Sequence, residues 1–153
     1  MKTRISAQRL IDAPAEVLYH CIADYVEHHR TDGFLPPEFS DLEVLRGGVG
    51  AGTEIRWVIN AGGRSRTVTA TVSEPVPGRR LVETGAGIET IFMVEPTIRG
   101  TWVRFDTTID DGGLQGVLSR LFAARLFGPV YEDELRRLED YAKAHPPLAA
   151  AAA

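Results

Sequence analysis

Two histidines and two carboxylates recur at intervals of four residues near the start of the chain. They are Glu16, His20, Asp24 and His28. On one unbroken helix all four would share a face, and imidazole and carboxylate groups placed in that way can bind a divalent metal ion. The helical pattern fades before the last histidine, however, and the series lies on the polar side of the segment, where solvated side chains are the rule. We therefore interpret the series as a solvated face and predict no metal site and no cofactor.

A single arginine interrupts an otherwise apolar helical face nearer the C-terminus. Arg125 shares that face with Leu118, Phe122 and Leu135. A buried arginine needs an acidic partner or a ligand oxygen, whereas a snorkelling arginine covers apolar surface with its stem and keeps its charge in water. Tyr131 presents the same two alternatives, a ligand-binding hydroxyl or a core aromatic ring. The residue pattern leaves both alternatives open.

The elements that position these side chains begin with a strand and a short helix. The strand is predicted over Lys2–Ile11, and Asp12 and Pro14 predict the cap and the first turn of the helix. Residues 24–38 are interpreted as a second short helix followed by an irregular segment, because a glycine and two prolines end the helical pattern there. From Leu114 to Ala144 the period is helical again, which predicts one long helix.

Between these helices, apolar and polar residues alternate in short runs separated by glycine-rich turns. This pattern is typical of antiparallel strands with one covered face and one wet face. The side chains expected to point toward the C-terminal helix are Ile55, Trp57, Ile59, Val103, Phe105 and Ile109. Arg56 and Arg104 are expected to point toward solvent. A slip of one residue would reverse every side chain, so the prediction is a sharp one.

Length and composition bound the function classes. The 153 residues fit one domain over 1–145, with a low-complexity tail over 146–153 that is predicted to be disordered. A net charge of −4 argues against a broad nucleic-acid-binding face. Cys21 is the only cysteine, which excludes an intramolecular disulfide and favours a reducing compartment. No leader pattern and no membrane-spanning apolar run are present, so we expect a cytoplasmic protein. No oligomeric state is indicated.

Several segments resemble the START-like, or SRPBCC, helix-grip superfamily, which includes polyketide cyclase/dehydrase and lipid-transport proteins. The resemblance is carried by the opening strand with residues 11–17, by 49–53, by Val94-Glu95-Pro96, by 100–103 and by the helix 114–144. Together these segments extend over about residues 2–144. The resemblance implies an α+β fold in which a curved seven-stranded antiparallel sheet wraps around the C-terminal helix. It also implies two short helices after the first strand and a hydrophobic tunnel between helix and sheet.

The same resemblance implies where a ligand would lie. The residues expected at the cavity mouth are Tyr25, His28, His29 and Phe34. A histidine there could act as a general acid or base near neutral pH, or the pair could lie exposed in a mobile loop. The residues expected to contact the ligand are Trp57, Ile59, Phe92, Phe105, Leu118, Phe122, Arg125 and Tyr131. No catalytic residue is carried over, because no segment matches a characterised cyclase closely enough.

The leading hypothesis is that the protein binds a hydrophobic small molecule, a lipid, polyketide or aromatic metabolite, in a cavity between the sheet and the C-terminal helix. One alternative is a polyketide cyclase or aromatase that uses the same cavity, which requires a titratable side chain with a shifted pKa inside it. A second alternative is a protein-interaction module, which requires a large exposed apolar patch instead of a cavity.

Overall fold

The computed structural model of the protein describes residues 2–61, 63–110 and 114–145, with the side chains of all of these except 114–124 and 126. Within these ranges the strands are β1 (Lys2–Ile11), β2 (Phe39–Arg46), β3 (Glu54–Ala61), β4 (Arg64–Val76), β5 (Arg80–Gly85), β6 (Ile88–Thr97) and β7 (Gly100–Asp110). The helices are α1 (Ala15–Ala23) and α2 (Leu114–Ala144). The predicted first strand and last helix are confirmed, and the tail predicted to be disordered lies outside the described residues.

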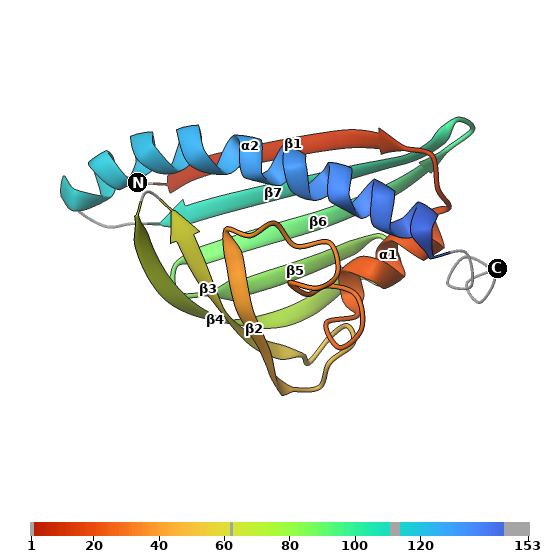
Figure 1. The fold of residues 1–153 in the computed structure, drawn as a ribbon, viewed down its shortest axis with the longest axis horizontal. Helices are drawn as coiled ribbons and strands as arrows, with labels where there is room; N and C mark the ends of the chain where they lie inside the picture. The colour runs from red at the N-terminus through yellow and green to blue at the C-terminus, as the bar shows by residue number, and fades with distance from the viewer. Residues whose placement is uncertain (1, 62, 111–113, 146–153) are drawn as a thin grey trace.

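All of these strands belong to one antiparallel sheet in the order β1-β7-β6-β5-β4-β3-β2. β1 pairs with β7 along its whole length, so the first and last strands of the chain lie side by side. The sheet is strongly curved, and α2 runs along the side formed by β1 and β7 (Figure 1). The predicted α+β helix-grip architecture, with a curved sheet around a long C-terminal helix, is therefore confirmed.

The side chains on the two faces of the sheet are arranged as the alternation predicts. The apolar residues predicted to point inward are buried at Ile55, Val103, Phe105 and Ile109 and half-buried against the core at Trp57 and Ile59. Arg56 is exposed and pairs with Glu43, and Arg104 is partly exposed and pairs with Asp106. The hydrophobic core thus lies between the concave face of the sheet and the two helices.

The second short helix predicted within residues 24–38 is wrong, because this segment folds into successive turns. The carboxylate of Asp24 accepts hydrogen bonds from the amides of Val26 and Glu27, at 3.0 and 2.9 Å. The amide of Tyr25 donates to the carbonyl of Gly48 at 2.9 Å. The two bonds to the Asp24 carboxylate have the geometry of a helix N-cap, and the amide of His28 also donates to the carbonyl of Asp24. The amide of His29 then donates to the same carbonyl, so the helical hydrogen-bond series stops after one turn. The chain after α1 is therefore held against the glycine-rich loop before β3.

α2 continues through Pro129 and carries one buried stripe toward the sheet. Its buried side chains within the described part are Val130, Tyr131, Glu134, Leu135, Leu138 and Ala142. Glu139 accepts a hydrogen bond from Arg9 at 2.9 Å and another from the amide of Asp12 at 3.3 Å, which joins the end of β1 to α2. Asp12 is not the cap of α1 as predicted, since Pro14 precedes the first turn and no side chain caps it. No helix in the described ranges has the length and apolar character needed to cross a membrane.

Candidate functional site

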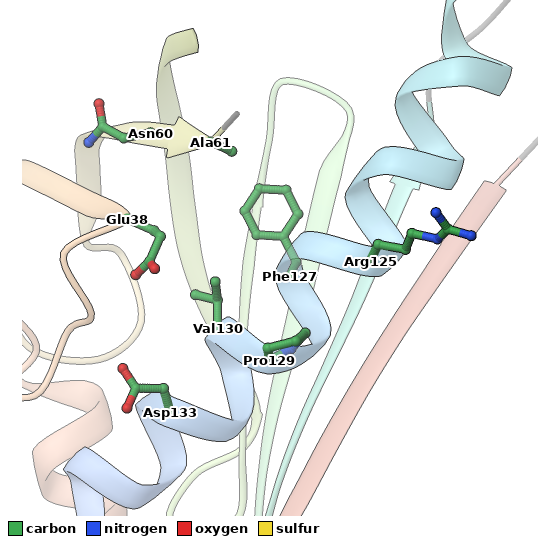
Figure 2. Close-up of a pocket in the computed structure, with 8 residues that line it drawn as sticks. All are labelled: Glu38, Asn60, Ala61, Arg125, Phe127, Pro129, Val130 and Asp133. Carbon is green, nitrogen blue, oxygen red and sulfur yellow. The ribbon is translucent and has the colours of Figure 1, made fainter. Parts of the chain in front are cut away.

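A pocket of about 470 Å³ opens beside the middle of α2 (Figure 2). The residues that line it are Glu38, Asn60, Ala61, Arg125, Phe127, Pro129, Val130 and Asp133. They come from the segment before β2, from the end of β3 and from α2. The Oε2 atom of Glu38 is buried and has no hydrogen-bond partner among the described residues. The pocket therefore combines an aromatic and aliphatic wall with four polar or charged side chains, a larger polar share than most small-molecule sites have.

A row of aromatic rings leads from this pocket into the core. Phe127, at the pocket wall, lies 6.3 Å from the parallel ring of Phe39 and 6.4 Å from Tyr131. The row continues from Tyr131 to Phe105 at 6.4 Å and from Phe105 to Phe92 at 4.8 Å. Edge-to-face and offset contacts of this kind suit aromatic packing. Phe92, Phe105 and Tyr131 are buried, so the row connects the pocket to the acids as packed core.

The row ends at a cluster of buried polar side chains. The ring of His29 packs edge-on against Phe92, at 5.6 Å, and stacks on Tyr25, at 4.5 Å. The hydroxyl of Tyr25 donates a hydrogen bond to Oε1 of Glu83 at 2.5 Å. His29 Nε2 lies 3.8 Å from Oε1 of Glu134. β5, α2 and the turn after α1 thus bring two glutamates, a histidine and a tyrosine together inside the core.

Burial controls the protonation of this cluster. It raises the pKa of Glu83 from 4.5 to about 7, although the hydrogen bond from Tyr25 opposes the rise. It also raises the pKa of Glu134 well above 4.5, and the charge of Glu83 adds to that effect. Burial lowers the pKa of His29 to about 4. At neutral pH His29 is therefore neutral and Glu83 exchanges its proton close to that pH, while burial and the charge of Glu83 both favour the protonated form of Glu134.

The hydrogen bonds of the cluster fix the orientation of its side chains. His29 Nδ1 lies 2.7 Å from the carbonyl oxygen of Ile22, and because a carbonyl only accepts, Nδ1 carries the proton. The lone pair of Nε2 then faces Glu134. Tyr131 is held in the same region by a hydrogen bond from Thr107 at 2.9 Å. Among the described residues, no lysine or arginine pairs with Glu83 or Glu134.

The sequence-predicted site residues fall into three groups. Phe92, Phe105 and Tyr131 lie in the aromatic row, and Trp57 and Ile59 lie half-buried at the edge of the same core. Arg125 borders the pocket but is exposed, and Figure 2 shows its guanidinium directed away from Phe127. The side chains of Leu118 and Phe122 lie outside the described residues.

The residues predicted at the cavity mouth lie deeper than expected. Tyr25, His29 and Phe34 are buried, because the turns after α1 fold inward, and His28 alone is partly exposed. Sequence reasoning missed Glu83 and Glu134 altogether. Both carried a signal: each carboxylate stands where the apolar pattern of its own element requires a buried residue.

The comparisons with known proteins agree with this architecture. The model of the polyketide cyclase/dehydrase and lipid transport family matches residues 2–143. No curated protein is similar enough in sequence to count as a match. Among solved structures, the KanY protein (ms6282) is 26% identical with a TM-score of 0.79, over 94% of this chain and 99% of its own. TTHA0849 from Thermus thermophilus is also 26% identical with a TM-score of 0.72, over 92% of this chain and 97% of its own.

An aromatase/cyclase shares the fold at lower identity. The Zhui aromatase/cyclase from Streptomyces sp. R1128 is 15% identical with a TM-score of 0.74, over 95% of this chain and 96% of its own. The strand order, the long helix gripped by the sheet and the family match over nearly the whole chain agree with one another. The protein therefore belongs to the polyketide cyclase/dehydrase and lipid transport family, within the helix-grip superfamily.

Proposed function

We propose that the protein is an acid–base enzyme acting on a hydrophobic carbonyl compound of the polyketide type, with Glu83 and Glu134 as its proton-transfer groups. The observation that carries the proposal is the burial of these two glutamates without a lysine or arginine partner among the described residues. A buried carboxyl without a cation costs folding stability. Two such groups in one core are hard to explain by packing, and they favour a functional role.

The pKa values assign a separate role to each glutamate. A group that titrates near pH 7 is well matched to act as a general base, which describes Glu83. Burial and the charge of Glu83 favour the protonated form of Glu134, which can donate a proton. Pairs of carboxyls whose environments separate their pKa values are a common arrangement in acid–base catalysis. Tyr25 keeps the Glu83 carboxylate oriented through its hydroxyl.

One group that removes a proton and one that donates a proton are what an intramolecular aldol-type cyclisation requires. Glu83 removes a proton from the carbon next to a carbonyl, and the electron pair of that carbon–hydrogen bond forms a new bond to a second carbonyl carbon. The oxygen of the second carbonyl takes the proton of Glu134. Loss of water follows in the same way, since one group removes a carbon-bound proton while the other protonates the departing hydroxyl. The site thus needs only its own side chains and the substrate.

Two further observations support a hydrophobic substrate. The aromatic row extends from the pocket at Phe127 to the ring of His29 beside Glu134, so a substrate that reaches the acids displaces packed rings and stays in apolar surroundings. Val130 and Asp133 line the pocket, and the next residues in the helix, Tyr131 and Glu134, belong to the buried cluster. The family match also includes cyclases and dehydrases by its description.

The test measures proton transfer directly. 2-Tetralone is a flat hydrophobic ketone, and its uptake of deuterium in D2O is followed by NMR with and without the protein. We expect wild type to accelerate exchange, with a rate that rises through about pH 7, and Glu83→Gln to lose roughly a hundredfold. Glu89→Gln, a change at an exposed residue of β6, is the matched control and keeps full activity.

A hydrophobic carrier is the second candidate, and the closed packing of the cluster favours it. The pocket wall does not include Glu83 or Glu134, and both are almost fully buried. A carrier would bind the neutral dye N-phenyl-1-naphthylamine with micromolar affinity, about −8 kcal/mol. It would leave the exchange of 2-tetralone unchanged in wild type and in Glu83→Gln. That pair of results would overturn the enzyme proposal and establish the carrier.

A further inference from the structure

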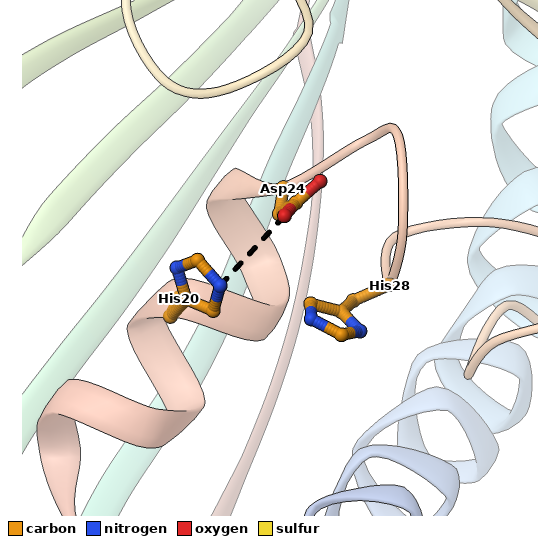
Figure 3. Close-up of side chains that lie close together, drawn as sticks. All are labelled: His20, Asp24 and His28. Carbon is orange, nitrogen blue, oxygen red and sulfur yellow. Dashed lines mark ion pairs between the residues drawn. The ribbon is translucent and has the colours of Figure 1, made fainter. Parts of the chain in front are cut away.

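His20, Asp24 and His28 come together at the end of α1 (Figure 3). One possible ligand atom from each residue lies within 4.8 Å of those of the other two. α1 ends at Ala23, so the three residues are not brought together by sharing one face of a continuous helix. The residues converge because the turn that starts at Asp24 folds back and returns His28 to the helix end.

The carboxylate of Asp24 is buried and held by only one of its oxygens. Oδ1 accepts the amides of Val26 and Glu27, which fixes the plane of the group. Oδ2 lies 3.7 Å from Nε2 of His20, beyond hydrogen-bond distance. No hydrogen bond to Oδ2 is found within the described part of the chain. One oxygen of a buried carboxylate therefore faces an imidazole nitrogen with a gap between them.

His28 is oriented by a residue of α2. Its Nδ1 is hydrogen-bonded to the hydroxyl of Tyr141 at 2.6 Å, which leaves Nε2 as the remaining ring nitrogen. The ring of His28 packs edge-on against that of His20, with 5.4 Å between the centroids. Histidines that bind metals commonly have their other ring nitrogen bonded to an oxygen in this way, because that bond sets the tautomer and the ring direction.

We propose that His20, Asp24 and His28 form a binding site for one divalent transition metal ion of the zinc type. Two imidazole nitrogens and one carboxylate oxygen are a common ligand set for zinc, with water in the remaining position. Ligand bonds of about 2.1 Å place neighbouring ligand atoms about 3.4 Å apart in a tetrahedral site. The His20–Asp24 separation of 3.7 Å is already close to this value, and no separation among the three exceeds 4.8 Å. The side chain of His20 is 43% exposed and is free to make most of the remaining movement.

A metal ion at this position would connect three parts of the fold. His20 belongs to α1 and His28 to the following turn, and Tyr141 extends the connection to α2. The residue after His28 is His29, whose ring contacts the buried cluster. The metal would thus stabilise the turn that carries His29, whatever chemistry takes place at Glu83 and Glu134.

The test uses Co²⁺ as a spectroscopic probe on the full chain, freed of any affinity tag. We expect one Co²⁺ per chain, a visible absorption band of tetrahedral intensity, and loss of that band when Zn²⁺ is added. His20→Gln and His28→Gln keep polar side chains of similar size and should each weaken binding by at least roughly tenfold. Glu16→Gln, one turn before His20 on α1, is the matched control and should bind as wild type does.

Thermal unfolding gives a second measurement. Zn²⁺ should raise the Tm of wild type and of Glu16→Gln and leave the Tm of both histidine variants unchanged, because only a folded site binds the metal. Circular dichroism verifies that each variant is folded before titration. Binding that is absent in wild type, that survives both histidine changes, or that Glu16→Gln weakens as much as His20→Gln would overturn the proposal.

Discussion

Replacing Glu83 with glutamine should stabilise the protein in a strongly pH-dependent way. The amide has nearly the shape of the protonated acid and can still accept the hydrogen bond from Tyr25. At pH 4 both side chains are neutral, so the two proteins should differ little in their free energy of unfolding. Above that pH the glutamate of the unfolded chain ionises first, because its pKa is 4.5 there and about 7 in the folded protein.

The magnitude follows from the difference between the two pKa values. A group whose folded pKa is raised stabilises the folded state below its unfolded pKa and loses that contribution as the pH rises through the folded pKa. At about 1.4 kcal/mol for each pH unit, wild type loses about 3 kcal/mol between pH 4.5 and pH 7 or slightly above. Glu83→Gln does not carry this cost, so its relative stability should grow by about 3 kcal/mol over that range.

Wild type alone does not isolate this loss, because His29 acts in the opposite direction and Glu134, whose pKa burial also raises, acts in the same direction. The lowered folded pKa of His29, about 4, means that the folded state loses stability as the pH falls from 6.5 toward 4. The contributions of Glu83 and His29 therefore largely cancel between pH 4.5 and pH 6.5. The difference between variant and wild type removes the histidine contribution, because both proteins contain His29, and it keeps only the part of the Glu134 contribution that depends on the charge of Glu83.

The assay is urea denaturation at pH 4, 5, 6, 7 and 8 with EDTA present, followed by tryptophan fluorescence and circular dichroism. For a chain of this size, 3 kcal/mol corresponds to an increase in Tm of about 6 to 12 °C at neutral pH. Glu89→Gln is the exposed control, and its difference from wild type should stay within about 0.5 kcal/mol at every pH. A Glu83→Gln difference that does not change with pH would refute the reasoning from burial.

Four further substitutions test other parts of the molecule. Tyr25→Phe removes the hydrogen bond that lowers the pKa of Glu83, so the midpoint of the 2-tetralone exchange profile should move above pH 7. Phe127→Ala removes a half-buried ring from the pocket wall and should cost about 2 kcal/mol in urea denaturation while weakening binding of N-phenyl-1-naphthylamine. Gly33→Ala would place a Cβ 1.9 Å from the carbonyl oxygen of His28 and should destabilise the protein by at least about 2 kcal/mol in urea denaturation. In Gly128→Ala the new Cβ meets no atom within 4 Å, so this change should stabilise α2 by up to about 1 kcal/mol.

Much of the fold was predictable because it depends on patterns that repeat along the chain. Period-two alternation placed Ile55 and Phe105 on the covered face, and each strand pairs with a neighbour whose alternation agrees with its own. The helical period from Leu114 to Ala144 predicted α2 at the observed bounds. Such patterns sum over many residues, so one misread residue does not change the outcome.

The segment after α1 was not predictable in the same way, because single hydrogen bonds decide its structure. The side chain of Asp24 accepts hydrogen bonds from two amides of the following turn. The amide of Tyr25 donates to the carbonyl of Gly48, which lies in a loop more than twenty residues later in the sequence. No local pattern contains that distant contact. The same turn buries Tyr25 and His29, and it also returns His28 toward His20. One unpredicted turn thus determines both the buried cluster and the proposed metal site.

The buried acids could have been predicted by asking which polar side chains on an apolar face are too short to reach solvent. Arg125 and Glu134 both interrupt the apolar face of α2, yet the structure exposes the first and buries the second. An arginine has a long stem and can carry its charge out to water, so its place on an apolar face says little about burial. A glutamate in the middle of a packed helix is too short to do so and must change its protonation instead. The same reasoning applies to Glu83, which stands two residues after the buried Leu81 and points to the same face of β5. A short acid on an apolar face is therefore a stronger signal of a functional site than a long base at an equivalent position.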